Sequence, residues 1–189
     1  MACTLTLGRL EPCKDVVGGI RAVYFANFGD LGAITKTASS DEITTFGGDP
    51  QFFEYEVKGN STFTQNIQSN RENGTTAFEQ VVELTLHKLT KEDHDELKLL
   101  IFGRPHMLIE DYNGNIFTAG LENGMDVSGG TIVTGGAMGD LSGYTLTLTG
   151  MERVPANFIV HAAADKTPAT AKAAIEATTT NATPIVEGS

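Results

Sequence analysis

The strongest constraint on the fold is a two-residue alternation of apolar and polar side chains in several short segments. Successive side chains of a β-strand point to opposite faces, so this pattern predicts strands with one apolar and one polar side. An Asn-Gly step between residues 106–111 and 115–118 adds a hairpin signal. The clearest alternating segments are 20–28 (IRAVYFANF), 51–57 (QFFEYEV), 62–68 (TFTQNIQ), 78–86 (FEQVVELTL) and 144–151 (YTLTLTGM).

One segment follows a helical period instead. Thr90 is a candidate N-cap before an acidic first turn, and Gly103 is a candidate stop. Leu97, Leu100 and Ile101 lie between them at helical spacing and form one apolar stripe. The sequence therefore predicts a mainly β fold: an antiparallel β-sandwich or barrel with one flanking α-helix (about 91–102) and a long hairpin.

Composition divides the chain into two parts. Residues 1–160 carry all the aromatic side chains, whereas residues 161–189 are rich in Ala and Thr and contain few large apolar groups. Such a segment buries too little apolar surface to offset its ordering entropy alone. We predict a β domain over 1–160 and a C-terminal arm over 161–189 that is flexible or ordered only on assembly, with a weak helix at 166–177.

The charge balance excludes one class of function. The chain has 24 acidic and 13 basic residues, a net charge of −11, so it lacks the basic surface of a nucleic-acid clamp. Residues 105–152 contain six acids and residues 39–57 contain five, and neither stretch has a Lys or Arg. Two interpretations remain: general solubility, or a surface that repels polyanions.

The N-terminus and the cysteines indicate the compartment. Residues 1–10 lack the basic start and apolar run of a signal peptide, and no apolar stretch is long enough to span a membrane. We therefore expect synthesis and folding in the cytoplasm. Cys3 and Cys13 match no zinc pattern, and two reduced thiols are favoured over a single bridge between them.

No segment carries a recognisable catalytic, cofactor or metal site, so we expect no enzyme, no cofactor and no metal. The glycine-rich run 129–139 lacks the Lys-Ser/Thr of a phosphate loop. In the helix, side chains at successive positions such as Asp93-His94-Asp95 diverge and cannot share a metal. The pairs Glu54/Glu56 and Glu79/Glu83 lie on polar strand sides, where solvated carboxylates are favoured over a glycosidase pair.

Three stretches resemble phage major tail tube proteins. They are TLTLGRLEPCKDVVGGIRAVYFANF near the N-terminus, FEQVVELTLHKLTKEDHDELKLLIFGRP, and SGGTIVTGGAMGDLSGYTLTLTGMERVPANFI, and the resemblance covers about residues 1–160. It implies a virion protein of the phage tail, made in the host bacterial cytoplasm. Its sheets would join laterally in six-fold rings, and the rings would stack through an N-terminal segment (Met1–Asp15) and a long hairpin (Phe46–Thr76).

The same resemblance implies the partners. They are further copies of this chain and other tail proteins (tape measure, baseplate and terminator), with DNA as non-bound cargo and no membrane. The lumen of such tubes is polar and mostly negative. We therefore predict a lumen set on the polar sides of the alternating strands: Glu54, Glu56, Thr62, Thr64, Asn66, Glu79 and Glu83.

Two alternatives remain, one within virion proteins and one from a different class. One is another virion protein, such as a tail-completion, baseplate-hub or capsid-decoration protein. The other is a carbohydrate-binding β-sandwich module, which the absence of Trp and the 7% aromatic content disfavour, because sugar sites commonly use exposed aromatic platforms.

Overall fold

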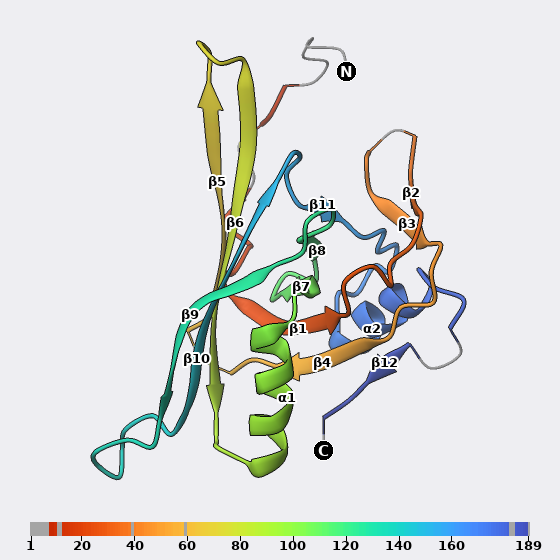
Figure 1. Ribbon diagram of the computed structural model, residues 1–189. Coiled ribbons are helices and arrows are strands. Elements are labelled where there is room, and N and C mark those ends of the chain that lie inside the picture. Colours follow the sequence, from red (N-terminus) through yellow and green to blue (C-terminus); the bar gives the residue numbers. More distant parts are fainter. Residues whose placement is uncertain (1–7, 11–12, 39, 59, 182–183, 189) are drawn as a thin grey trace.

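The computed structural model describes residues 8–10, 13–38, 40–58, 60–181 and 184–188 (Figure 1). Within them the fold is mainly β, as the alternation predicts, with strands in antiparallel sheets and two helices. The elements in chain order are β1 (Ile20–Ala26), β2 (Ile34–Lys36), β3 (Ile43–Phe46), β4 (Phe52–Glu56), β5 (Thr62–Asn70), β6 (Thr75–His87), α1 (Lys91–Phe102), β7 (His106–Asp111), β8 (Ile116–Ala119), β9 (Asp126–Val133), β10 (Gly143–Glu152), β11 (Asn157–Phe158), α2 (Pro168–Glu176) and β12 (Ile185–Val186).

Two sheets face each other. One has six strands in the order β11-β8-β7-β1-β4-β12, and the other has four in the order β5-β6-β10-β9. All pairs in the four-stranded sheet are antiparallel, whereas β12 joins β4 in parallel at the edge of the six-stranded sheet. A separate β2–β3 hairpin lies beside the six-stranded sheet (Figure 1).

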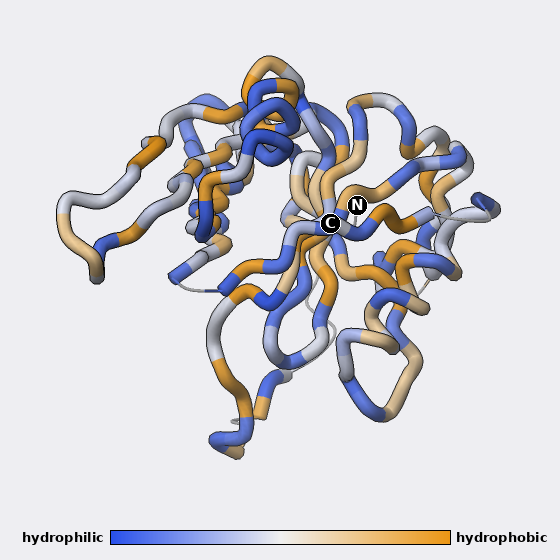
Figure 2. Tube along the Cα trace, turned by 90° about the horizontal axis from the view of Figure 1, so that it is seen from below, coloured by the Kyte–Doolittle hydropathy of each residue, from blue (hydrophilic) through white to orange (hydrophobic). Residues whose placement is uncertain are grey.

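Apolar side chains form two cores, one on each face of the six-stranded sheet. Between the sheets, Val23 and Phe25 of β1 pack with Val82 and Leu148 of the four-stranded sheet. On the other face, Tyr24 belongs to a second core that includes residues of α2 and of the β2–β3 hairpin. β1 is thus a central strand buried on both sides, and the hydrophobic segments of the trace meet in the body of the molecule (Figure 2).

Helix α1 has the predicted bounds and caps. The Thr90 hydroxyl accepts a hydrogen bond from the Asp93 amide at 3.1 Å, and the Gly103 amide donates to the Leu99 carbonyl at 2.9 Å. Leu97 is the only buried side chain of α1. The imidazole ring of His94, also on this helix, lies 6.4 Å from the ring of Tyr144 of β10, measured between centroids. The helix therefore rests on the sandwich by a narrow stripe.

The C-terminal segment is ordered within a single chain, which differs from the predicted arm. Helix α2 begins at a capping box formed by Thr167 and Thr170, and it buries Ala171 and Ile175 in the second core. Past the helix, β12 pairs with β4. The physical reason is that small alanine side chains let α2 approach the sheet closely, so two isoleucines and a few alanines suffice to fill the space.

The long hairpin of the structure overlaps the predicted 46–76 range but does not match it. β4 and β5 belong to different sheets, so the first part of that range is not one arm of a hairpin; Gly59, between the two strands, lies outside the described residues. The projecting hairpin is β5–β6, with its turn at residues 71–74 (Figure 1). In the predicted stacking segment 1–15, residues 1–7, 11 and 12 lie outside the described residues, including Cys3, and Cys13 is exposed.

Candidate functional site

The outer side of the four-stranded sheet is a continuous polar surface, which we call the open face. Its members alternate with core residues along each strand and lie beside one another in the strand registers. No Lys or Arg occurs among the strand residues on this face, all of which are described. The members are Thr62, Thr64, Asn66 and Gln68 of β5; Glu79, Val81, Glu83 and Thr85 of β6; Thr145, Thr147, Thr149 and Met151 of β10; and Asp126, Gly129 and Thr131 of β9.

Hydrogen bonds between neighbouring strands order these side chains. The Thr62 hydroxyl donates to Glu83 Oε2 at 3.3 Å, and the Asn66 amide donates to Glu79 Oε2 at 3.3 Å. On the other half of the sheet, the hydroxyls of Thr131 and Thr145 lie 2.6 Å apart. Cross-strand pairs of this kind fix the side chains that they join. Neutral donors on β5 therefore hold the carboxylates of Glu79 and Glu83.

The opposite side of the same strands explains why this face must point outward. Phe63 of β5, Leu84 of β6, and Leu146 and Leu148 of β10 all pack between the two sheets. Because a shift of one residue would exchange the two faces, burial of these side chains fixes the register and turns the Thr and Glu side chains to the outside.

Both edges of the four-stranded sheet are unpaired in the described part of the chain. β5 pairs only with β6, and β9 pairs only with β10. Each of these edge strands also exposes a large apolar side chain: Ile67 is 70% exposed and Ile132 is 55% exposed. Long unpaired edges with exposed apolar groups favour pairing with another strand.

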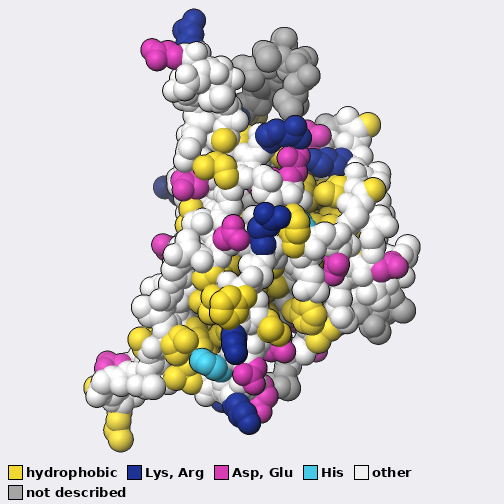
Figure 3. Space-filling view, viewed as in Figure 1, with side chains coloured by type: hydrophobic (Ala, Val, Ile, Leu, Met, Phe, Trp, Pro, Cys, Tyr) yellow, Lys and Arg dark blue, Asp and Glu magenta, His cyan; other side chains and the backbone are white. Residues whose placement is uncertain are grey.

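Helix α1 adds exposed apolar surface near β9. Leu99 and Phe102 are 67% and 82% exposed. Phe28, which lines a cavity with Leu99, is 44% exposed, and the Arg104 guanidinium lies 3.9 Å from its ring centroid. Figure 3 shows hydrophobic side chains gathered on this lower part of the molecule. A contiguous apolar patch of this kind is typical of a protein–protein contact.

The structure brings five of the seven predicted lumen residues onto the open face: Thr62, Thr64, Asn66, Glu79 and Glu83. It places Glu54 and Glu56 elsewhere, on β4 of the six-stranded sheet. The Glu54 side chain is only 7% exposed and pairs with Lys172 of α2 at 2.7 Å, whereas Glu56 is exposed and lies 3.4 Å from Lys58. The predicted set is therefore not one surface, because β4 belongs to the other sheet and α2 covers Glu54 there.

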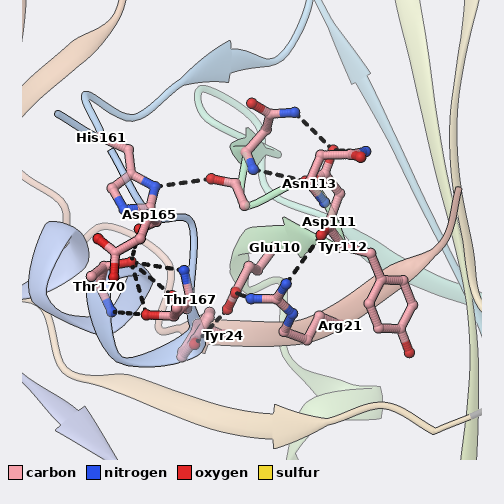
Figure 4. Close-up of polar contacts among 12 residues, drawn as sticks. Arg21, Tyr24, Glu110, Asp111, Tyr112, Asn113, His161, Asp165, Thr167 and Thr170 are labelled. Atoms are coloured by element: carbon pink, nitrogen blue, oxygen red, sulfur yellow. Dashed lines mark hydrogen bonds and ion pairs between the residues drawn. The ribbon is translucent and has the colours of Figure 1, made fainter. Parts of the chain in front are cut away.

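A buried polar cluster that sequence analysis missed lies beneath α2 (Figure 4). Glu110 of β7 is fully buried; its Oε1 lies 2.7 Å from the Arg21 guanidinium, and its Oε2 accepts a hydrogen bond from the Tyr24 hydroxyl at 3.1 Å. Burial raises the pKa of Glu110, and Arg21 and Tyr24 oppose that shift. Burial, together with the neighbouring Glu110, raises the pKa of Tyr24 above its ordinary value, so Tyr24 remains a donor. The cluster ties β1 to β7.

Lys172 makes a second ionic connection, which holds the C-terminal segment. Its ammonium group lies 2.7 Å from Glu54 of β4 and 2.6 Å from Glu187, directly after β12. Burial opposes the charge of Lys172, but the two carboxylates outweigh it and raise the pKa of its ammonium group. One cation therefore joins α2, β4 and the chain end.

A concave site of about 410 Å³ lies between β4, the start of α1 and residues 186–188. Tyr55 and Tyr144 line it together with Asp93, Glu96 and Glu187. Burial and the nearby Glu96 and Asp93 raise the pKa of Tyr55 to about 12. The described residues contain no cluster of three or more His, Cys, Asp or Glu side chains suited to a metal ion.

In the loop between β9 and β10, Asp140 Oδ2 accepts hydrogen bonds from the amides of Gly136 and Ala137 at 3.0 and 2.7 Å, so its carboxylate shapes the loop.

Neither helix in the described ranges has the length and apolar character needed to cross a bilayer. No family model, no curated protein and no solved structure matches the chain.

Proposed function

We propose that the chain is a structural protein that polymerises into stacked rings, forming a tail tube of a bacteriophage through which DNA passes without being bound. The observation that carries this proposal is the open face: hydroxyls and carboxylates, with no Lys or Arg among its strand residues, on a sheet whose two edges are unpaired in the described part of the chain. A polyanion is repelled by carboxylates, and these strand residues offer it no cation.

Strand direction supports lateral joining of identical copies. The order β5-β6-β10-β9 contains an even number of strands, all antiparallel, so β5 and β9 run in opposite directions. If β9 of one copy meets β5 of the next, the new pair is antiparallel like the others. A repeated heterologous contact of this kind closes into a ring and leaves no free edge.

The exposed apolar groups lie where such a contact would cover them. Ile67 and Ile132 are on the two edge strands, and α1, which carries the exposed Leu99 and Phe102, contacts β9. The open faces of all copies would then line one lumen, with Glu79, Glu83 and Asp126 as its carboxylates. The partners are further copies of the chain and the other proteins of the tail.

The direct test is assembly of the purified full chain. Electron microscopy and sedimentation at rising protein concentration should show rings or tubes. An edge variant, Ile67→Lys, should stop assembly without unfolding the subunit, because it places a charge on an exposed position of the free β5 edge.

A matched control lies next to that residue. Gln68→Lys changes the same strand but points to the open face, so it should leave assembly intact. A chain that remains a monomer at high concentration, or an Ile67→Lys variant that assembles like the unmodified chain, would contradict the proposal.

The role of the open face is tested in assembled tubes. The double variant Glu79→Lys with Glu83→Lys should still assemble, because both residues lie away from the edges, but it should bind DNA in its lumen and slow DNA passage. Unchanged DNA passage through these tubes would argue against an electrostatic role for the surface.

A further inference from the structure

The chain contains three Asn-Gly steps, at Asn73-Gly74, Asn113-Gly114 and Asn123-Gly124. At such a step the backbone nitrogen of the glycine can attack the side-chain carbonyl carbon of the asparagine, since glycine has no Cβ to crowd the approach. The reaction needs a side-chain amide that is free to rotate and a glycine N–H that is free to lose its proton. The three steps differ sharply in both respects.

Asn113 is held on all sides. Its amide nitrogen donates to the Val17 carbonyl at 2.7 Å, and its amide oxygen accepts from the Val17 N–H at 3.0 Å. The N–H of Gly114 donates to the Asp111 carbonyl at 3.1 Å. Both reacting groups at this step are therefore engaged in hydrogen bonds.

Asn123 is held in a similar way. Its amide nitrogen donates to the Met151 carbonyl at 2.8 Å, and the N–H of Gly124 donates to the Gly120 carbonyl at 3.1 Å. Gly124 is also buried, and a side chain there would collide with Arg104. Reaction at this step requires the loop to open first.

Asn73 lies in the exposed turn of the β5–β6 hairpin, where nothing comparable holds it. Its own backbone N–H donates to the Asn70 side chain at 3.1 Å, but the structure records no hydrogen bond for its side-chain amide or for the Gly74 N–H within the described residues. Gly74 has a φ of 63° and open space around it. We propose that Asn73 is a deamidation site that converts spontaneously to aspartate and isoaspartate in the folded protein.

The chemistry needs only water. The Gly74 nitrogen gives its proton to solvent and bonds to Asn73 Cγ, the Cγ–Nδ2 bond breaks, and ammonia leaves with a proton taken from solvent. Water then opens the cyclic imide at either carbonyl, which yields aspartate or isoaspartate. The net change replaces an amide by a carboxylate, so the turn that holds Arg71 and Glu72 gains one negative charge.

The product should remain folded. The hairpin is held by nine cross-strand residue pairs, from Thr62 opposite Glu83 to Asn70 opposite Thr75, and the reacting step lies outside them. The modification therefore changes the charge and the backbone of the hairpin tip without reaching the core.

The test is incubation of the folded full-length protein in mildly alkaline buffer, followed by peptide mapping with a fragmentation method that separates aspartate from isoaspartate. Asn73 should react first, about 30-fold or more faster than Asn113 and Asn123, because two or three hydrogen bonds must open at each of those steps. In denaturant the three rates should converge to within a few-fold.

A matched variant completes the design. Asn73→Gln should fold identically and abolish the fast step, since ring closure from the longer side chain is slow. The proposal is overturned if Asn113 or Asn123 reacts as fast as Asn73 in the folded protein. It is equally overturned if all three asparagines stay intact in the folded protein while reacting in denaturant.

Discussion

The two sheets of this molecule are built from similar strands but differ in how their faces are covered and in their edge strands. The six-stranded sheet is covered on both faces, and its edges carry the short strands β11 and β12. The four-stranded sheet is covered on one face only. Its β5–β6 hairpin reaches beyond the core, and its edge strands β5 and β9 are unpaired within the described residues. The difference indicates that one sheet holds the fold together, whereas the other leaves one face uncovered.

The largest expected effect comes from the doubly covered sheet. Leu108 of β7 is buried in the second core, so Leu108→Ala should lower the free energy of unfolding by about 3–4 kcal/mol through lost burial and a cavity. Urea denaturation followed by circular dichroism measures it. A loss below about 1 kcal/mol would show that this side of the sheet is loosely packed.

The next effect tests the buried ion pair of the same sheet. Arg21→Met should lower the free energy of unfolding by about 2–3 kcal/mol, because it leaves the buried Glu110 carboxylate without its cation. Adding Glu110→Gln should recover part of that loss. Equal stability of the single and double variants would mean that the charge of Glu110 is solvated in some other way.

A smaller effect tests how the C-terminal segment is attached. Lys172→Met removes the cation shared by Glu54 and Glu187 and should cost about 1–2 kcal/mol, with faster hydrogen exchange in α2 and β12. Lys58→Met is the control, because its ion pair with Glu56 is exposed and should not matter. Unchanged exchange in α2 would show that apolar packing alone holds the segment.

The dependence of stability on pH separates a buried carboxyl from the open-face carboxylates. Burial raises the pKa of Glu152, which is 2% exposed and whose Oε2 has no hydrogen-bond partner. A carboxyl with a raised folded-state pKa stabilises the fold most below its ordinary pKa, and that contribution is lost as the pH rises through the raised value. Glu152→Gln should therefore raise the free energy of unfolding at neutral pH and flatten its fall from mildly acidic to neutral pH.

The measurement is denaturant unfolding at a series of pH values, with Glu83→Gln as the exposed carboxyl control. If the Glu152 variant follows the same pH curve as the unmodified protein, then Glu152 titrates like a solvated group.

The smallest expected effect comes from the open face. Thr64→Ala should change the free energy of unfolding by less than about 0.5 kcal/mol, since its side chain is exposed and no core residue depends on it. The comparison with Leu108→Ala is the sharpest form of the contrast between the two sheets. A large loss in Thr64→Ala would mean that the open face contributes to the subunit's own stability.

The sequence predicts much of this architecture because alternation and capping are local. The bounds of α1 follow from Thr90 and Gly103, and the alternation in 62–68 and 78–86 correctly divides the open face from the core. The hairpin at Asn113-Gly114 is confirmed by the pairing of β7 with β8.

Sequence alone could not predict which strands share a sheet or what covers them. Alternation gives the two sides of β4, but only the tertiary fold brings Lys172 over Glu54. Arg21 and Glu110 are 89 positions apart, so no local pattern links them. Helix α2 is held by close packing of small side chains. Its low content of large apolar residues therefore gave no sign in the sequence that it packs on the sheet.

The two hydrogen bonds between the Asn113 side chain and Val17 affect the chemical stability of the protein over time. The Asn113 carboxamide hydrogen-bonds to both the backbone N–H and the carbonyl of Val17, which precedes β1. The same two hydrogen bonds keep that carboxamide from cyclising. Anchorage and chemical durability are thus inseparable at this position. Any change that breaks the hydrogen bonds between Asn113 and Val17 would therefore also allow Asn113 to deamidate slowly.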